Sequence, residues 1–156
     1  MQKITPFLWF DNNADEAMHF YTSIFKNSQI KDVSRYPDNH PEFAGKIMTG
    51  TFVLEGQEFM ALNGGPMFKF TEAISMFVRC ETQDEIDYYS SKLADQGTQE
   101  QCGWITDKFG LSWQIVPTCL GELLSNPDPV KANKVLQAML QMQKLDIQVL
   151  KEATNS

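Results

Sequence analysis

The sequence predicts an α+β fold built from two similar modules, each reading strand, helix and further strands, followed by a C-terminal helix. The main observation is an internal repeat: the segment that starts at Ile4 aligns with the segment that starts at Ile74, and Phe7 falls beside Phe77. The second observation is apolar periodicity, of strand type and then of helix type, in both segments. The third is a composition with 42% hydrophobic and 21% charged residues, which is typical of a folded globular chain.

Each module begins with an apolar run of strand length, residues 4–10 and residues 73–80, which leads through a polar cap into a helix. Thr82 and Glu85 have the spacing of a capping box, and Asn13 with Glu16 has the same spacing. Apolar residues then recur every three or four positions, which predicts one buried stripe per helix. In the first helix these are Ala14, Ala17, Met18, Tyr21 and Phe25, and in the second they are Ile86, Tyr89, Leu93 and Ala94.

Further strands follow each helix. They are expected at residues 29–36, 45–54 and 57–63 in the first module, and at residues 101–106 and 111–117 in the second. Gly56 and Gly110 provide the tight turns between consecutive strands. Residues 37–45 form the one long irregular loop.

The chain beyond Pro117 predicts a terminal helix. Asp128 is the expected cap, Pro129 the first helical residue, and the helix runs over residues 130–150. Its apolar residues cover more than one face, so it needs its own sheet, a second subunit, or both as neighbours. The expected organisation is residues 1–66 and 73–118 as the two modules and 119–156 as a C-terminal extension, in one compact fold.

The charge balance limits the partners. A formal net charge of -7 has the wrong sign for a nucleic-acid binder or an anionic-membrane binder, so a small molecule or a protein is expected. No apolar run approaches the roughly 18 residues that cross a bilayer, and the first residues do not resemble an export signal. This predicts a cytoplasmic protein. Three cysteines without a CxxC pair predict buried free thiols.

Several segments carry a resemblance to a known family. They are Ile4-Thr5-Pro6-Phe7-Leu8-Trp9-Phe10, Glu16-Ala17-Met18-His19-Phe20-Tyr21, Ala61-Leu62-Asn63-Gly64-Gly65-Pro66, and Gln101-Cys102-Gly103-Trp104 through Pro117, with Asp107-Lys108-Phe109-Gly110 before the last strand. Over about residues 3 to 120 the chain resembles the PhnB-like branch of the vicinal oxygen chelate superfamily. The resemblance implies two βαβββ modules that form a cupped mixed sheet, the glyoxalase and bleomycin-resistance fold, in a homodimer.

Members of that branch often carry the label 3-demethylubiquinone-9 3-methyltransferase. A methyltransferase holds S-adenosylmethionine, usually on a glycine-rich turn between a strand and a helix. Neither strand-to-helix junction of this chain contains glycine. The residues therefore predict no cofactor, and whether the chain is an enzyme stays open.

The resemblance also implies four metal ligands in metal-using relatives, one from the first and one from the last strand of each module. The corresponding positions hold Gln114, Met60, Thr5 or Pro6, and Ser75 or Met76. One amide with hydroxyls and thioethers is a poor donor set for a divalent ion. We therefore expect no metal.

The cup is expected to bind a small, partly apolar molecule. Its expected ligand-binding residues are Thr5, Phe7, Trp9, Phe52, Asn63, Ser75, Trp104 and Gln114, with Met48 and Trp113 as additional lining. His40, with Glu42 beside it, is the candidate for acid–base chemistry near neutral pH. Arg79 is expected to pair with an acidic neighbour or, failing that, with an anionic ligand.

Besides methyl transfer, which the family label names, three kinds of function remain open at this point. The first is a metal-free protein that binds a small molecule and whose reaction is unknown. The second is a metal-dependent enzyme of the glyoxalase or dioxygenase type, with ligands such as Gln114 and His40. The third is a protein that sequesters a drug without turnover, as bleomycin-resistance relatives do.

Overall fold

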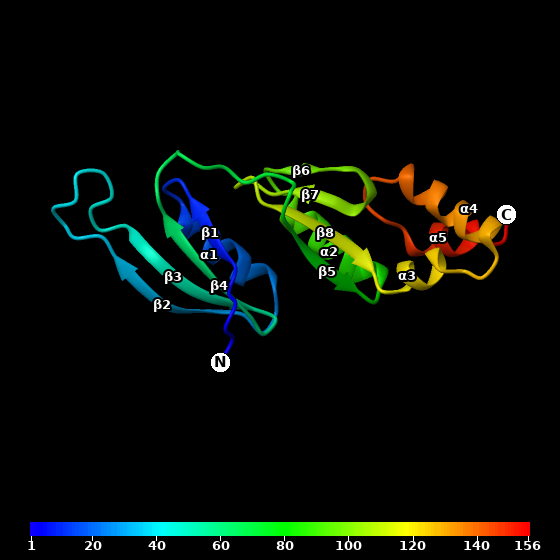
Figure 1. Ribbon diagram of the computed structural model, residues 1–156, viewed down its shortest axis with the longest axis horizontal. Coiled ribbons are helices and arrows are strands. Elements are labelled where there is room, and N and C mark those ends of the chain that lie inside the picture. Colours follow the sequence, from blue (N-terminus) through cyan, green and yellow to red (C-terminus); the bar gives the residue numbers. More distant parts are fainter. The chain divides into compact units, whose positions relative to one another are not determined.

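A computed structural model describes all residues, 1–156, and divides the chain into two compact units, Met1–Phe70 and Thr71–Ser156 (Figure 1). The first unit contains β1 (Phe7–Phe10), α1 (Ala14–Ile24), β2 (Gln29–Arg35), β3 (Ile47–Leu54) and β4 (Gln57–Asn63). The second contains β5 (Ser75–Cys80), α2 (Gln83–Leu93), β6 (Thr98–Gln99), the 3₁₀ helix η1 (Gln101–Gly103), β7 (Trp104–Thr106), β8 (Ser112–Pro117), α3 (Cys119–Leu124), α4 (Pro129–Leu140) and α5 (Ile147–Ala153).

Each unit contains one four-stranded mixed sheet, and the two sheets have the same topology. The strand orders are β1-β4-β3-β2 and β5-β8-β7-β6. In each sheet the first strand pairs in parallel with the fourth, and the other pairs are antiparallel. The predicted α+β fold of two βαβββ modules is therefore confirmed. The sequence pattern missed β6, because a strand of two residues is too short to show an alternation of period two.

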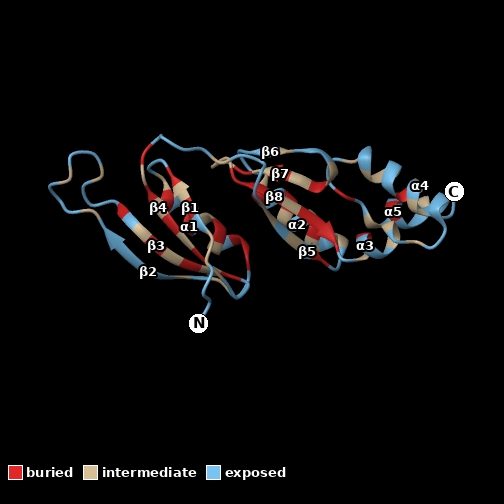
Figure 2. Ribbon diagram, in the orientation of Figure 1, coloured by how far each residue is buried: buried red, intermediate tan, exposed pale blue.

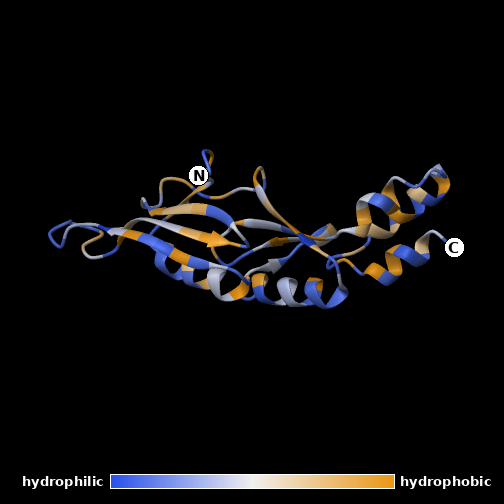
Figure 3. Ribbon diagram, turned by 90° about the horizontal axis from the view of Figure 1, so that it is seen from below, coloured by the Kyte–Doolittle hydropathy of each residue, from blue (hydrophilic) through white to orange (hydrophobic).

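The core of the first unit lies between α1 and one face of its sheet (Figures 2 and 3). Phe52 is fully buried there and stacks on Tyr21 of α1 and on Phe59 of β4, with ring centroids 6.2 and 5.4 Å apart. A Cβ on Gly50 would stand 2.7 Å from Cε of Met18, so glycine on β3 lets the helix approach the sheet closely.

The second unit repeats this arrangement with α2 against its sheet. Ile86 and Leu93 of α2 are fully buried on the side that also buries Trp113. The turn between β7 and β8 depends on the buried carboxylate of Asp107. It accepts hydrogen bonds from the backbone amides of Phe109 and Leu111 and from Nε1 of Trp113, at 2.8, 3.0 and 2.9 Å.

The two helix caps differ in origin. The predicted capping box of Thr82 and Glu85 is confirmed at the start of α2. The predicted cap of α1 by the side chain of Asn13 is wrong, because Asn13 makes no side-chain cap bond. Instead Asn63, at the end of β4, accepts a 2.8 Å hydrogen bond from the backbone amide of Ala14. A residue 49 positions away thus satisfies the first amide of the helix.

The prediction of a single terminal helix over residues 130–150 is also wrong. Asp128 caps and Pro129 begins α4 as predicted, but α4 ends at Leu140 and α5 begins after Asp146. The apolar residues of the extension instead gather in a core of their own with β8, made of Val116, Leu120, Val135, Leu145 and Leu150. A chain that turns back after α4 can bury several apolar faces at once, which one straight helix cannot.

The extension is tied to the rest of the second unit by hydrogen bonds. The backbone amides of Cys102 and Gly103 donate to the carbonyls of Met142 and Gln143, at 2.9 and 2.7 Å. Gln83 of α2 donates to the carbonyl of Leu145 and accepts from the amide of Ile147. The extension is therefore part of the second unit, at the end of β8. None of its helices, nor any other helix of the chain, has the length and apolarity to cross a membrane.

Candidate functional site

The candidate site is the face of each sheet that turns away from α1 or α2, which we call the open face. Side chains alternate along a strand, so burial identifies the two faces. In β1, Leu8 and Phe10 are buried against α1, whereas Phe7 is 48% exposed and Trp9 is half-buried. Phe7 and Trp9 therefore lie on the open face of the first sheet, opposite Met60 and Leu62 of β4.

Trp9 is held in place by its own unit. Its Nε1 donates a 2.9 Å hydrogen bond to the carbonyl of Gly65, and Phe68 packs edge-on with ring centroids 4.9 Å apart. A Cβ on Gly64 would stand 2.4 Å from the Trp9 ring, so the ring needs glycine there. Thr5 lies just before β1, and its hydroxyl is 3.5 Å from Nε2 of Gln2. The one polar atom of the Trp9 side chain is thus already used inside the protein.

The open face of the second sheet brings together three of the expected ligand-binding residues. Gln114 of β8 lies opposite Phe77 of β5 on one side and opposite Trp104 of β7 on the other. Its Nε2 donates a 2.9 Å hydrogen bond to Oγ of Ser75. Phe77 is 47% exposed, and Ser75, Trp104 and Gln114 are half-buried. Sequence reasoning missed Phe77, although its alignment with Phe7 in the repeat was a signal for it.

Arg79 lies on the same face, two residues beyond Phe77 on β5. Its guanidinium carbon is 5.3 Å from the centre of the Phe77 ring, a cation–π distance. Arg79 makes no ion pair. The expected pairing with an acidic neighbour is therefore wrong, and the guanidinium lies over the Phe77 ring instead.

The C-terminal extension borders this face at the end of β8. Val116 is two residues beyond Gln114 and opposite Arg79, so it belongs to the open face by register. It is nevertheless buried, because it packs into the core of the extension with Leu120 and Leu145. The open face of the second sheet is consequently closed at one end by α3–α5.

Three residues expected at the site lie in the core instead. Phe52 and Asn63 are fully buried on the side of α1, where Phe52 stacks on Tyr21 and Asn63 caps the helix and donates to the carbonyl of Ile47 at 2.9 Å. Trp113 is buried on the side of α2. The residues next to them along the strands point to the opposite face of the sheet. The aromatic or amide character of a side chain did not predict on which of the two faces it lies. Met48 is exposed on β3.

His40 and Glu42 lie in the loop between β2 and β3. Nδ1 of His40 accepts hydrogen bonds from the amides of Glu42 and Phe43, at 3.2 and 3.0 Å, so the neutral ring carries its proton on Nε2. The ring packs against both Tyr36 and Phe43, with centroid distances of 4.6 and 5.6 Å. The hydroxyl of Tyr36 donates to the carbonyl of Asn63 at 2.7 Å, which attaches the loop to the end of β4.

The metal-ligand positions of the repeat do not fit a divalent ion. Register places Met60 opposite Phe7 and Gln114 opposite Phe77, so these two residues occupy equivalent positions in the two sheets. They offer one thioether and one amide, and the amide nitrogen is already bonded to Ser75. No three side chains of His, Cys, Asp or Glu gather where they could hold a metal ion. A thioether and an amide are poor ligands for a divalent ion.

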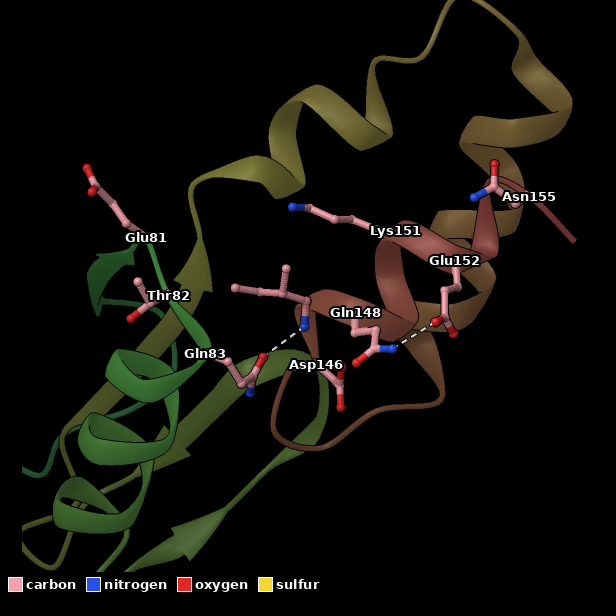
Figure 4. A pocket seen from close by; sticks show the side chains of 9 residues that line it. Glu81, Thr82, Gln83, Asp146, Gln148, Lys151, Glu152 and Asn155 are labelled. Carbon is pink, nitrogen blue, oxygen red and sulfur yellow. Dashed lines mark hydrogen bonds between the residues drawn. The ribbon is translucent and has the colours of Figure 1, made fainter.

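A separate pocket of about 530 Å³ lies between the start of α2 and α5 (Figure 4). Most of the residues that line it are exposed, and Gln83 in its lining accepts a hydrogen bond from the amide of Ile147. Lys151 and Glu152 of α5 stand at its rim. None of the residues expected at the site lines it.

Two mixed sheets of βαβββ topology, each covered by a helix on one face, define the vicinal oxygen chelate fold of the glyoxalase, bleomycin-resistance and dioxygenase proteins. Residues 2–116 match the family model described as 3-demethylubiquinone-9 3-methyltransferase, and the chain belongs to that family. A PhnB protein from Bacillus cereus, provisionally named a 3-demethylubiquinone-9 3-methyltransferase, is 43% identical with a TM-score of 0.71. The match covers 75% of this chain and 100% of that one.

More distant solved structures share the fold. Protein PA1353 from Pseudomonas aeruginosa is 21% identical with a TM-score of 0.64, and the match covers 75% of this chain and 98% of that one. The fosfomycin resistance protein FosX from Listeria monocytogenes is 14% identical with a TM-score of 0.57, with 78% and 94% covered. No curated protein matches the chain. The family match ends at residue 116, so α3–α5 lie outside it.

Proposed function

We propose that this PhnB-like protein binds a small, partly apolar molecule on its open faces, without a metal ion. The observation that carries the proposal is the group formed by Ser75, Phe77, Trp104 and Gln114 on the second sheet. Exposed aromatic rings beside a few oriented polar groups are the usual lining of small-molecule sites. The family membership supports the fold that carries such a site. Neither the family membership nor the fold identifies the substrate or the reaction.

The polar atoms of this group are arranged to specify a ligand. Because Nε2 of Gln114 donates to Ser75, the amide orientation leaves Oε1 as an acceptor with no partner in the protein. The indole N–H of Trp104 likewise has no acceptor in the protein. One acceptor and one donor next to two aromatic rings fit a molecule with both a flat apolar part and a polar edge.

The metal-dependent alternative rests on the fold alone. A FosX structure that contains Mn(II) and sulfate is 14% identical to this chain, which is similarity of fold and not of site. The ligand positions of this chain hold Met60 and Gln114, and neither offers a carboxylate or an imidazole. We therefore propose binding without metal. Sequestration of a drug without turnover is one form of that binding.

The family name states a methyl transfer, but the chain has no glycine-rich turn for S-adenosylmethionine. The junctions that lead into α1 and α2 are Asp11-Asn12-Asn13 and Glu81-Thr82. The backbone amide of Ala14 at the start of α1 and that of Glu85 in the first turn of α2 already have acceptors in Asn63 and Thr82. We propose that methyl transfer is not the activity of this protein.

Protein-observed NMR tests the proposal, with phenol and indole as neutral aromatic probes. We expect both to shift the indole N–H of Trp104, assigned with Trp104→Phe, and the side-chain amide of Gln114 in a saturable manner. Phe77→Ala should weaken this binding at least about 5-fold, because it removes one of the two aromatic rings of the group. Tyr88→Ala, which removes a 42% exposed ring from α2, is the control and should bind as the wild type does.

The same samples test the alternatives. Mn(II) should cause no selective broadening of the Gln114 amide, and S-adenosylmethionine should cause no shifts. Selective broadening at Gln114 by substoichiometric Mn(II) would overturn the metal-free proposal. Binding of S-adenosylmethionine at the open face would overturn the proposal that methyl transfer is not the activity of this protein.

A further inference from the structure

The chain contains two arginines, and the structure treats them differently. Arg35 lies at the end of β2, where its Nη1 is 3.6 Å from a carboxylate oxygen of Asp15 and donates to the carbonyl of Gly45 at 3.1 Å. Arg79 has neither kind of partner. An arginine in an acidic chain ordinarily finds a carboxylate, because twenty are available here. The isolation of Arg79 therefore calls for a reason.

The sequence of the second sheet supplies part of that reason. Its four strands read Ser-Met-Phe-Val-Arg-Cys, Thr-Gln, Trp-Ile-Thr and Ser-Trp-Gln-Ile-Val-Pro, and Arg79 is the one charged residue among them. The first sheet differs, because its open face carries the ion pair of Lys31 and Glu58 at 3.6 Å. A sheet with a single positive charge and no negative one attracts an anion.

A carboxylate does reach the far side of this face, but it is distant from Arg79. Oε1 of Glu100 accepts a 3.3 Å hydrogen bond from the hydroxyl of Thr106 on β7. Register places Thr106 opposite Ser112 of β8, whereas Arg79 lies opposite Val116. Thr106, which holds the Glu100 carboxylate, is thus two strands across and four residues along the sheet from Arg79, and Glu100 forms no ion pair with Arg79.

The guanidinium of Arg79 lies over the Phe77 ring, with its carbon 5.3 Å from the ring centre. A guanidinium that lies over an aromatic ring keeps its in-plane N–H groups free, and these match the two oxygens of a carboxylate, phosphate or phosphonate. The extension adds to this environment, because Val116, the register partner of Arg79, is buried by it. An anion at Arg79 would therefore lie close to the apolar Val116, and because Arg79 is exposed, salt would screen its charge-assisted hydrogen bonds.

We propose that Arg79 binds an anionic group of the small molecule, a carboxylate or a phosphoryl or phosphonyl group, while the apolar part of the molecule lies on Phe77 and Trp104. This inference rests on the proposed function, since it names the chemical class of ligand that the open face of the second sheet takes. Gln114 and the indole N–H of Trp104 then contact the polar edge of the ligand.

The test compares two anionic probes, phenylacetate and phenylphosphonate, with the neutral probe 2-phenylethanol, by titration of the Trp104 indole N–H signal. We expect the anions to bind at least about 10-fold more tightly than the alcohol at low salt, and this advantage to shrink as salt increases. Arg79→Met should lower the affinity for the anions about 10-fold or more and leave that for the alcohol unchanged. Arg79→Lys should lose less than Arg79→Met.

Arg35→Met is the matched control, because it removes the other arginine and should leave all three affinities unchanged. Arg79 is exposed, so its substitution should not unfold the protein, and the thermal midpoint of Arg79→Met checks this. Equal affinity for the alcohol and the anions, with no effect of Arg79→Met, would overturn the inference and leave the proposed function standing. If no probe, charged or neutral, shifts the Trp104 signal, both are overturned.

Discussion

Alternation along a strand decides whether an aromatic residue stabilises the fold or is available to a ligand. Phe7 and Phe52 are chemically the same and were both expected at the site. Phe52 is fully buried between Tyr21 and Phe59, whereas Phe7 is half exposed on the other face of the same sheet. Only Phe52 contributes the full burial of its side chain to stability.

Substitution by alanine should separate these two roles. Phe52→Ala is expected to lower the free energy of unfolding by about 3–5 kcal/mol, because it leaves a cavity in the core. Phe7→Ala should cost less than about 1 kcal/mol, because solvent already reaches the ring. Urea unfolding followed by circular dichroism measures both, and similar losses for the two variants would contradict the assignment of faces.

Cys80 shows how burial controls reactivity. It is fully buried at the end of β5, and desolvation, with a smaller effect of the Glu85 carboxylate, raises the pKa of its thiol from 9.0 to about 11. Cys102 and Cys119 are half-buried. At pH 8 about one Cys80 thiol in a thousand is ionised, and the thiolate is the reactive form.

Iodoacetamide at pH 8 should therefore modify Cys102 and Cys119 well before Cys80, and peptide mass spectrometry can follow the three sites. The raised pKa also makes the folded state lose stability between pH 9 and about 11, since the unfolded chain ionises this thiol first. Cys80→Ala should remove that part of the pH dependence. Early modification of Cys80 in the folded protein would show that it is accessible.

At the scale of elements, the first residue of α2 holds the C-terminal extension. The amide group of Gln83 makes three hydrogen bonds, to Asp87 within α2 and to Leu145 and Ile147 of the extension, at 3.0, 3.1 and 2.9 Å. Figure 4 shows the bond between its Oε1 and the amide of Ile147. Gln83 thus satisfies an amide at the start of α5.

Gln83→Ala should free the extension locally without unfolding the sheet. We expect amides of α5 to exchange faster with solvent, with a local opening free energy lower by about 1–3 kcal/mol, and amides of β8 to exchange as before. Gln148→Ala on α5 is the control, because its amide bonds only Glu152 within the same helix. Equal exchange rates of the α5 amides in Gln83→Ala and Gln148→Ala would mean that Gln83 does not hold the extension.

Asp87 links the same two elements electrostatically. A hydrogen bond from Lys144, with Gln83 as the next cause, lowers the pKa of the Asp87 carboxyl below 3.8. Because the folded pKa is lowered, this contact stabilises the fold above pH 3.8 and is lost as the pH falls through the folded pKa. Lys144→Met should raise the pKa of Asp87 towards 3.8 in an NMR titration of the carboxyl carbon, and an unchanged pKa would contradict this cause.

At the scale of the whole molecule, the C-terminal extension is the part of this chain that the family model does not describe. The apolar residues of the extension form an internal core with Val116, so they are no argument for a second subunit. We still propose a homodimer with a small molecule as its other partner, and no nucleic acid or membrane. The family resemblance and the net charge of -7 support this.

Native mass spectrometry of gently purified protein tests the number of subunits, the bound metal and the bound small molecule in one measurement. The expected spectrum shows twice the mass of one chain, with no divalent metal and with any retained small molecule as an added mass. A monomer at micromolar concentration would overturn the dimer. A stoichiometric metal would contradict the donor chemistry of Met60 and Gln114 and would favour the metal-dependent alternative.

Short-range chemistry in the sequence determined the strand and helix order of each module, the capping box of Thr82 and the start of α4 at Pro129. Each of these depends on residues within a few positions of one another. The tertiary structure decided what depends on distant residues: the cap of α1 by Asn63, the folding back of the extension onto Val116, the burial of Phe52 and the isolation of Arg79. A side chain's hydrophobicity predicts that it needs a neighbour, but only the packing of distant elements determines which neighbour it meets and which face it leaves open.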